Sequence, residues 1–180
     1  MPGTDELSLC PFTIVIDKNE GAPYHFQEIK DRKKKKNTLV IKTCEKALYA
    51  MSRREVVTEK GTFEIGLADY TIEGYEEQVQ VERKSLVDLF GTFGGKRDRF
   101  EAEIKRLSED CEVAAVVVES SWQGVLMHKG HGPHPNSVRA TIQAWAQRYQ
   151  GVHWWFFENR AIAERETFRL LERFWRDRNE

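Results

Sequence analysis

Short apolar runs of strand length alternate with amphipathic stretches of helical spacing through the second half of the chain. Residues 113–118 and 152–157 are two such runs. Apolar residues recur every three or four positions over residues 138–149 and 168–175, as the buried face of a helix requires. Strands that alternate with helices build a sheet that is covered by those helices. The sequence therefore predicts an α/β fold with a mixed central β-sheet flanked by helices.

The first half of the chain adds two strands and two helices to this prediction. Residues 12–16 are mostly β-branched and end at Asp17, and residues 79–82 alternate between apolar and polar side chains. Ser85 and Asp88 have capping-box spacing for a helix start, and residues 100–107 show helical spacing after the glycines at 94–95. Residues 38–66 mix short apolar stretches with polar residues, and strand and helix both stay open there.

Length and composition indicate a single folded domain, 1–180. The 180 residues include 40% hydrophobic ones, which excludes a disordered chain. Lysine and arginine number 28 against 29 acidic residues, so binding of nucleic acid through bulk positive charge alone is excluded. No run approaches the roughly 18 apolar residues of a membrane span, and the first residues lack the pattern of an export signal. We therefore expect no membrane association.

The cysteines point to a reducing compartment. Cys10, Cys44 and Cys111 are odd in number and contain no CxxC pair. A disulfide framework and a cysteine-based zinc site are therefore both unexpected. Without an export signal, this usage predicts a cytoplasmic protein.

Two local groups of basic residues are candidates for contacts with phosphate. Residues 30–36 hold six basic side chains and one acid, among them Lys33, Lys34, Lys35 and Lys36. Lys96, Arg97 and Arg99 follow the glycine pair at 94–95. Backbone phosphates are bound by such side chains without regard to base sequence. A solvated loop and a solvated helix face are the alternatives for these two groups.

Acidic residues and one lysine fall at the ends of predicted strands: Asp17, Asp69, Glu82, Lys84 and Glu119. Sites gather at strand ends in open α/β sheets. The two-residue period of a strand puts Glu82 and Lys84 on one face, with Arg83 on the other. An ordinary surface ion pair is the alternative explanation of this spacing.

Carboxylates crowded together repel one another unless a cation joins them. Oxygen ligands favour Mg²⁺ or Mn²⁺ over zinc, and Mg²⁺ takes a few carboxylates together with water and substrate phosphate. In this hypothesis Asp69 and Glu82 hold the metal, and Lys84 positions the attacking water or offsets charge in the transition state. The predicted reaction is hydrolysis of a phosphodiester.

The residues around these side chains carry a family resemblance. Residues 66–72, GLADYTI, and 81–89, VERKSLVDL, resemble the GDYxx and ERKxxxDL motifs of the XPF-type structure-specific nuclease domain. The segment that ends at Asp17 and Glu20 is similar to the VDxRE opening of that family, and the strand ending at Glu119 to its later acidic strand. The resemblance extends over nearly the whole chain. Asn19 and Ala68 depart from the family's arginine and glycine.

The resemblance implies a metal-dependent DNA endonuclease with the restriction-endonuclease-like PD-(D/E)xK fold. Asp69, Glu82 and Lys84 would form the core of the site, and Asp17, Glu20 and Arg83 would support it. Its substrate would be branched, flap or junction DNA in repair, recombination or phage DNA processing, because compact phage and prophage members are similar. The C-terminal helix-hairpin-helix domain of many members is not expected in 1–180. A homodimer or a partner subunit would then supply binding of the duplex arms.

Other interpretations stay open at this point. The chain could be a non-catalytic DNA-binding or scaffold subunit of a nuclease complex, or a nuclease of the same superfamily with another target. His128, His131 and His134 could bind zinc or contact substrate, although an exposed loop explains them as well. Trp122 is a candidate for the substrate edge, whereas the other tryptophans are expected in the core or a dimer interface. Asp88 is favoured as a helix-capping acid over a metal ligand.

Overall fold

A computed structural model describes residues 6–180. The first five residues of the predicted domain 1–180, where an export signal would begin, lie outside the described residues. The strands are β1 Leu7–Asp17, β2 Thr38–Lys46, β3 Arg54–Thr58, β4 Gly61–Ile65, β5 Tyr70–Ile72, β6 Val79–Lys84, β7 Val113–Val118 and β8 Val152–Phe156. The helices are α1 Leu48–Met51, α2 Leu86–Gly95, α3 Arg97–Asp110, α4 Trp122–Leu126, α5 Pro135–Arg148 and α6 Arg160–Asn179.

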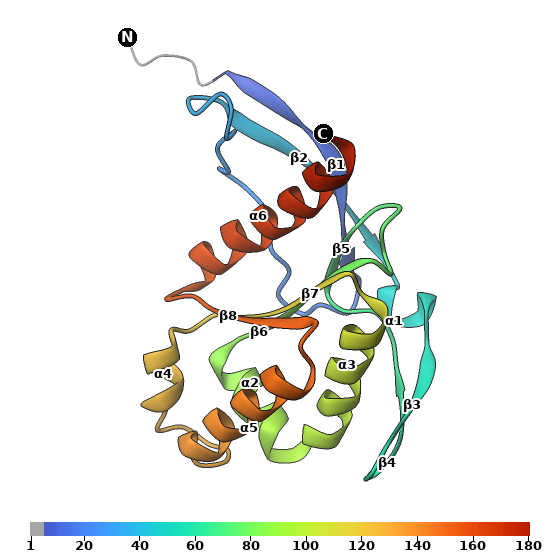
Figure 1. Cartoon of the computed structure of the whole chain (residues 1–180). Helices are drawn as coiled ribbons and strands as arrows, with labels where there is room; N and C mark the ends of the chain where they lie inside the picture. Colours follow the sequence, from blue (N-terminus) through green and yellow to red (C-terminus); the bar gives the residue numbers. More distant parts are fainter. Residues whose placement is uncertain (1–5) are drawn as a thin grey trace.

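The central sheet is mixed, as the alternation of runs and helices predicted. Its strand order is β2-β1-β5-β6-β7-β8 (Figure 1). Strand β5 runs antiparallel to β1 and β6, whereas β1 and β2, and also β6, β7 and β8, pair in parallel. Helices link the parallel strands β6, β7 and β8, so the predicted α/β class with a mixed sheet flanked by helices is confirmed.

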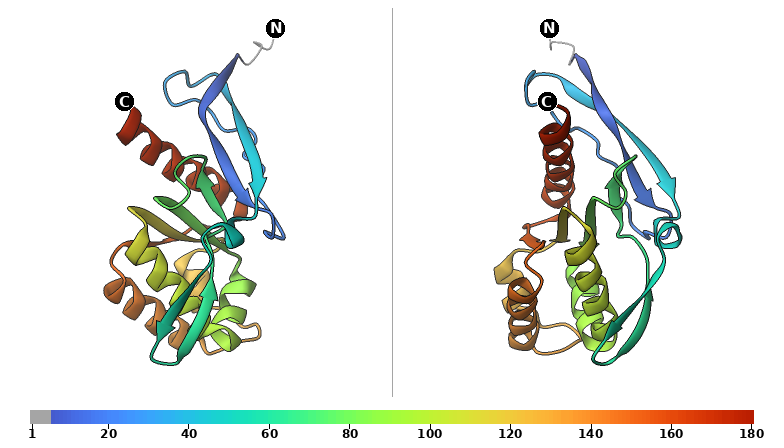
Figure 2. Two further views of the ribbon diagram at one scale, coloured as in Figure 1. Left: turned by 90° about the vertical axis from the view of Figure 1, so that its right-hand side faces the viewer. Right: turned by 45° about the vertical axis from the view of Figure 1, so that its right-hand side comes forward.

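Helices cover both faces of the sheet (Figure 2). On one face α6 buries Phe168, Leu171 and Phe174 against β1, β5, β6 and β7. On the other face α2, α3 and α5 pack against β7 and β8, and Trp145 is 2% exposed at the centre of this second core. The apolar stripes that predicted these helices are therefore the surfaces that seal the sheet.

The undecided region 38–66 contains both strands and a short helix. Strand β2 pairs with the outer side of β1, α1 is a single turn, and β3 and β4 form an antiparallel hairpin. The hairpin packs Val56 and Ile65 against Ala102 of α3. Its strands are largely exposed, so the burial pattern that marks the central strands is weak in them.

The helix start at Ser85 agrees with the prediction. The Ser85 side chain accepts a hydrogen bond from the backbone N–H of Asp88 at 3.1 Å, as an N-cap does. Helix α2 includes the glycines at 94–95, so the interruption lies one residue later than the sequence predicted. Lys96 alone separates α2 from α3. Helix α2 therefore begins directly after β6, the strand that carries Glu82 and Lys84.

The cysteines are not paired with one another in the structure. Burial raises the pKa of the Cys10 thiol to about 11 and that of Cys111 to about 12, which suppresses thiolate reactivity. Within residues 6–180 no helix has the length and apolar character needed to cross a bilayer.

Candidate active site

Three strands bring the predicted acidic residues together. Asp17 is the last residue of β1, and Glu82 lies near the end of β6. Asp69 precedes β5 rather than ending a strand, because the segment before it is irregular. Tyr70, its neighbour, pairs with residues of both β1 and β6. Because β5 is antiparallel to β1 and β6, the first residues of β5 lie beside the last residues of those strands. Asp69 therefore lies near Asp17 and Glu82, as predicted.

Glu82 and Lys84 lie on the same face of β6, as the two-residue period predicted. Lys84 Nζ is 2.6 Å from Glu82 Oε1, and each side chain is only 15% exposed. The same ammonium group lies 4.8 Å from the centre of the Phe100 ring. Burial would lower the pKa of Lys84, but the carboxylates of Glu82 and Asp69 outweigh it and raise this pKa. Lys84 is therefore a cation at every physiological pH.

Asp69 is buried beside Glu82. Its Oδ2 accepts a hydrogen bond of 2.7 Å from the backbone N–H of Arg83. Burial, followed by repulsion from the Glu82 carboxylate, raises the pKa of Asp69 well above its ordinary value, although Lys84 opposes the shift. The carboxyl groups of Asp69 and Glu82 therefore disfavour each other's ionisation.

Glu82 and Glu103 line two neighbouring hollows, and Asp69 lines the smaller one. A cavity of about 130 Å³ is lined by Asp17, Asp69, Glu82 and Glu103. A wider cleft of about 660 Å³ is lined by Glu82, Lys84 and Glu103 as well. Asn19, Asp88, Lys96 and Arg99 also line this wider cleft. Substrate can therefore approach Glu82 and Lys84 from the side of α2 and α3.

Glu103 of α3 is a member of the cluster that sequence reasoning missed. Burial and the Glu82 carboxylate raise its pKa to about 7, against the opposing effect of Lys84 and Arg99. Arg99 Nε lies 3.2 Å from Glu103 Oε1 one turn away. The sequence carried a signal for it, because position 103 lies three residues after the buried Phe100, on the apolar side of α3.

Arg83 and its acidic partners lie on the other face of β6. Arg83 Nη1 is 3.1 Å from Glu20, and its Nε and Nη2 atoms donate to Glu119 at 2.8 and 3.1 Å. All three side chains are less than 10% exposed. Arg160 of α6 adds a second cation at 3.0 Å from Glu119. Glu20 and Glu119 thus hold the Arg83 side chain on this face, while Asp69 and Glu82 line the cavity.

A buried polar lock, formed by Gln80 and Arg106, fixes the segment in front of Asp69. Gln80 Oε1 accepts hydrogen bonds of 3.0 Å from the Ala68 N–H and from Arg106 Nη1. Arg106 Nη1 also donates to the Gly66 carbonyl at 3.0 Å. A Cβ on Gly66 would lie 2.0 Å from the Tyr49 carbonyl oxygen, so only glycine fits there. Neither Gln80 nor Arg106 was among the residues predicted for the site.

The predicted phosphate-binding groups lie in different places. Lys96 and Arg99 line the cleft beside Glu82, whereas Arg97 lies 6.0 Å from the Trp145 ring. The segment with Lys33, Lys34, Lys35 and Lys36 precedes β2. It therefore lies at the opposite end of β1 from Asp17, because β1 and β2 pair in parallel from Leu7↔Thr38 to Asp17↔Lys46. The structure does not bring this segment to the carboxylates.

The histidine loop has structural partners. His128 stacks on Phe90 at 3.9 Å between ring centres, and His134 accepts a hydrogen bond from the Asn136 N–H as the N-cap of α5. Across residues 6–180, no group of three or more histidine, cysteine or acidic side chains is placed to hold a metal ion. The interpretation of the histidines as a zinc site is therefore wrong. Trp122 packs against Phe156 at 4.8 Å.

The donor set at Asp69 and Glu82 fits a hard divalent cation. It supplies two carboxylates, and Mg²⁺ sites commonly combine so few carboxylates with water and substrate phosphate. A cation there would also relieve the repulsion that raises the pKa of Asp69. Asp69 and Glu82 are the residues that would hold it.

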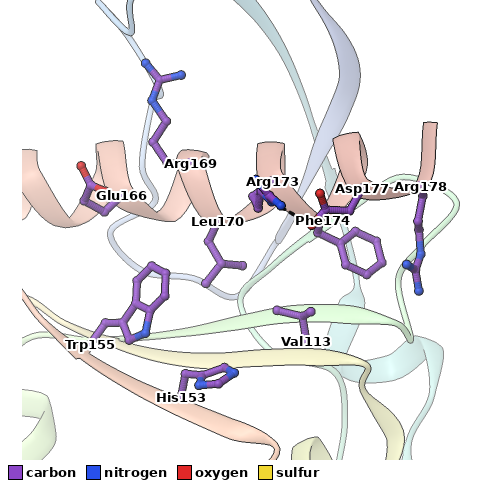
Figure 3. Close-up of a pocket in the computed structure, with 10 residues that line it drawn as sticks. All are labelled: Val113, His153, Trp155, Glu166, Arg169, Leu170, Arg173, Phe174, Asp177 and Arg178. Carbon is purple, nitrogen blue, oxygen red and sulfur yellow. Dashed lines mark hydrogen bonds and ion pairs between the residues drawn. The ribbon is translucent and has the colours of Figure 1, made fainter. Parts of the chain in front are cut away.

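A separate groove lies between α6 and the edge strand β8 (Figure 3). It has a volume of about 310 Å³, with Trp155, Leu170 and Phe174 among its apolar side chains. Arg173 at its rim is paired with Asp177 at 2.8 Å. No residue proposed for the site lies in this groove.

Two solved structures share this arrangement of strands and helices. XPF from Aeropyrum pernix aligns with a TM-score of 0.54 and 15% sequence identity over 93% of this chain. XPF from Aeropyrum pernix in complex with DNA gives a TM-score of 0.54 and 16% identity over 92%. The chain spans 65% and 66% of those structures, less than two thirds of their length. The likeness confirms the restriction-endonuclease-like fold of the XPF nuclease domain.

No curated protein matches the chain. The model of the ERCC4 domain matches residues 20–174, a range that begins at the Glu20 partner of Arg83 and includes Asp69, Glu82 and Lys84. The chain therefore belongs to the ERCC4 domain family of XPF-type nuclease domains.

Proposed function

We propose that the protein is a Mg²⁺- or Mn²⁺-dependent DNA endonuclease that hydrolyses phosphodiester bonds at Asp69, Glu82 and Lys84. The observation that carries the proposal is that these three side chains lie close together. Asp69 and Glu82 line one cavity, and Lys84 Nζ lies 2.6 Å from Glu82. Membership of the ERCC4 domain family supports the same activity.

Each side chain has a distinct task in this proposal. Asp69 and Glu82 hold the divalent ion, which when bound polarises the scissile phosphate and acidifies a water molecule. Lys84 stays protonated and places a positive charge where the phosphate gains negative charge in the transition state. Asp17 lines the cavity beside Asp69, and the Arg83 backbone N–H orients the Asp69 carboxylate.

Branched, flap or junction DNA is the proposed substrate class, in repair, recombination or phage DNA processing. The family resemblance supplies this expectation, and one of the two matched structures is XPF in complex with DNA. Lys96 and Arg99 support it, because both cations line the cleft beside Glu82 and Lys84, where they could contact a DNA backbone. Arg97, which lies between Lys96 and Arg99 in sequence, would contact flanking phosphate only by leaving Trp145.

The proposal is tested with labelled fork, flap, four-way-junction and linear duplex DNA, each with Mg²⁺, Mn²⁺ or EDTA. We expect cleavage that requires the metal and that falls by about 100-fold or more in the Glu82→Gln and Lys84→Ala variants. Arg165→Gln, at a side chain 55% exposed on α6, is the matched control and should cut normally. Metal-dependent cleavage that persists in both site variants would contradict the assignment.

The same assay separates the catalytic function from the alternative one. DNA binding without cleavage under any divalent cation would favour a non-catalytic DNA-binding or scaffold subunit. A homodimer, or a partner subunit that binds the duplex arms, is a further part of the proposal. Sedimentation that shows only a monomer at micromolar concentration, with full activity on junctions, would contradict it.

A further inference from the structure

The lysine-rich segment 30–36 folds into a fixed turn. Asp31 Oδ1 accepts hydrogen bonds from the backbone N–H groups of Lys33 and Lys34 at 2.7 and 3.1 Å. Asn37 closes the turn, because its N–H donates to the Lys34 carbonyl at 2.7 Å and its side chain donates to Ser8 at 2.9 Å. Asn37 is only 5% exposed. The lysines are therefore presented from an anchored piece of backbone.

Three exposed lysines of this turn form no direct ion pair, although the Asp31 carboxylate attracts Lys34 electrostatically. Lys34, Lys35 and Lys36 are exposed, and their side chains form no ion pair or hydrogen bond with residues 6–180. Lys33 differs, because its Nζ pairs with Glu180 at 3.0 Å. Lys42, in the middle of β2, is likewise exposed. Together Lys34, Lys35, Lys36 and Lys42 form what we call the lysine track.

The track lies on the β1–β2 ribbon, which forms one edge of the sheet beside the C-terminal end of α6 (Figures 1 and 2). The paired register runs from Leu7↔Thr38 beside the turn to Asp17↔Lys46 beside the carboxylates. At about 3.3 Å per residue, the span of β1 is about 33 Å. One turn of B-form DNA measures about 34–36 Å. A duplex that lies along the ribbon would therefore present the same side of its backbone to both ends.

We propose that the lysine track binds the phosphate backbone of double-stranded DNA about one helical turn from the bond to be cleaved. The inference rests on the proposed function, since it places the cleaved bond at Asp69 and Glu82. Unpaired lysine cations on a fixed turn complement a polyanion, and they act as point charges that do not read base sequence. The substrate is thus a duplex arm long enough to span the ribbon.

The test measures binding to branched DNA whose duplex arms are hairpin-capped and 6 or 16 base pairs long, in EDTA so that nothing is cut. The variant combines Lys34→Gln, Lys35→Gln and Lys36→Gln. We expect it to bind the long-arm DNA at least 10-fold more weakly, with a salt dependence reduced by up to about 3 in slope. Binding to the short-arm DNA should be unchanged.

Two controls make the result specific. Lys33→Gln, at the lysine already paired with Glu180, should weaken binding to the long-arm DNA by less than 3-fold. A second variant removes three cations elsewhere, with Arg148→Gln, Arg165→Gln and Arg173→Gln. It should leave the difference in binding affinity between long-arm and short-arm DNA unchanged. All these side chains are at least 55% exposed, so the variants should fold.

The failure of this inference can be told from failure of the proposed function. Equal weakening on both arm lengths, or none on the long arm, overturns the lysine track even if the protein cuts DNA. Loss confined to the long arm supports the track even if no metal ion supports cleavage, in which case only the proposed function falls.

Discussion

The Asp69 carboxylate accepts a 2.7 Å hydrogen bond from the backbone N–H of Arg83, while the Arg83 side chain lies on the opposite face of the sheet. There it joins Glu20 and Glu119, both less than 10% exposed. One residue of β6 thus fixes a proposed metal ligand with its backbone and fixes the end of the strand with its side chain. The neighbours of Arg83 in sequence, Glu82 and Lys84, line the wider cleft.

Asp69→Asn separates the charge of Asp69 from its structural role. The amide oxygen can still accept the Arg83 N–H, so the fold should persist. We expect a melting temperature above that of the wild type without metal, because a buried carboxyl with a raised pKa is removed. Cleavage should fall by about 100-fold or more, and Mn²⁺ should no longer raise the melting temperature. Wild-type cleavage by this variant would exclude Asp69 as a metal ligand.

Arg83→Met tests the network on the other face. It leaves the buried carboxylates of Glu20 and Glu119 without their main cation, a change that costs about 3–5 kcal/mol in buried ion pairs. In a domain of this size we expect the melting temperature to fall by about 10 °C. Arg53→Gln breaks an exposed pair with Glu64 and should cost less than about 1 kcal/mol. Equal losses in the two variants, measured by thermal unfolding, would contradict a supporting role for Arg83.

The sequence was sufficient where burial is strong and spacing is local. Strands β7 and β8 are apolar runs in the core and the long helices bury one apolar face each, so the apolar pattern of these elements is clear in the sequence. The placement of Glu82 and Lys84 on one face follows from the alternation of a single strand. The motif residues that lie within a few positions of each other could therefore be assigned to the site from the amino-acid sequence alone.

Features that depend on distant partners could not be predicted. The β3–β4 hairpin is half exposed and is stabilised by α3, which lies more than thirty residues later. Glu103 reaches Glu82 only because the crossover between β6 and β7 folds α3 back over the sheet. The position of the lysine turn, far from Asp17, follows from the parallel pairing of β2 with β1, and residues 38–46 do not reveal that pairing.

Gln80→Leu tests the lock behind Asp69. The change removes the acceptor for the Ala68 N–H and for Arg106, which is 2% exposed. The Ala68 N–H is left without its partner, whereas Arg106 keeps the Gly66 carbonyl. A buried polar group left without a partner costs about 1–3 kcal/mol, so we expect a loss of about that size in urea unfolding.

Asp69 lies next to Ala68, so the maximal cleavage rate of Gln80→Leu should fall more than its KM changes. Gln80→Glu keeps the acceptor oxygen and exchanges an Nε2 atom that has no partner among residues 6–180, so it should restore both properties. A Gln80→Leu protein with wild-type stability and rate would rule out the lock as a positioning element.

The Glu103 carboxyl should make the metal-free protein less stable as pH rises. Its pKa is raised to about 7 in the fold, from an ordinary value of 4.5, so between these pH values the folded state holds a proton that the unfolded state has lost. Stability therefore falls across this window, by up to about 3 kcal/mol for this group. Urea unfolding midpoints between pH 4.5 and 8 measure the effect.

Glu103→Gln should flatten this decline, while Asp69, whose pKa is also raised, still makes stability fall with pH in both proteins. Glu109→Gln, at an exposed position of the same helix, is the matched control and should retain the wild-type decline. Parallel curves for the wild type and Glu103→Gln would show that Glu103 is not held protonated by burial and by the Glu82 charge.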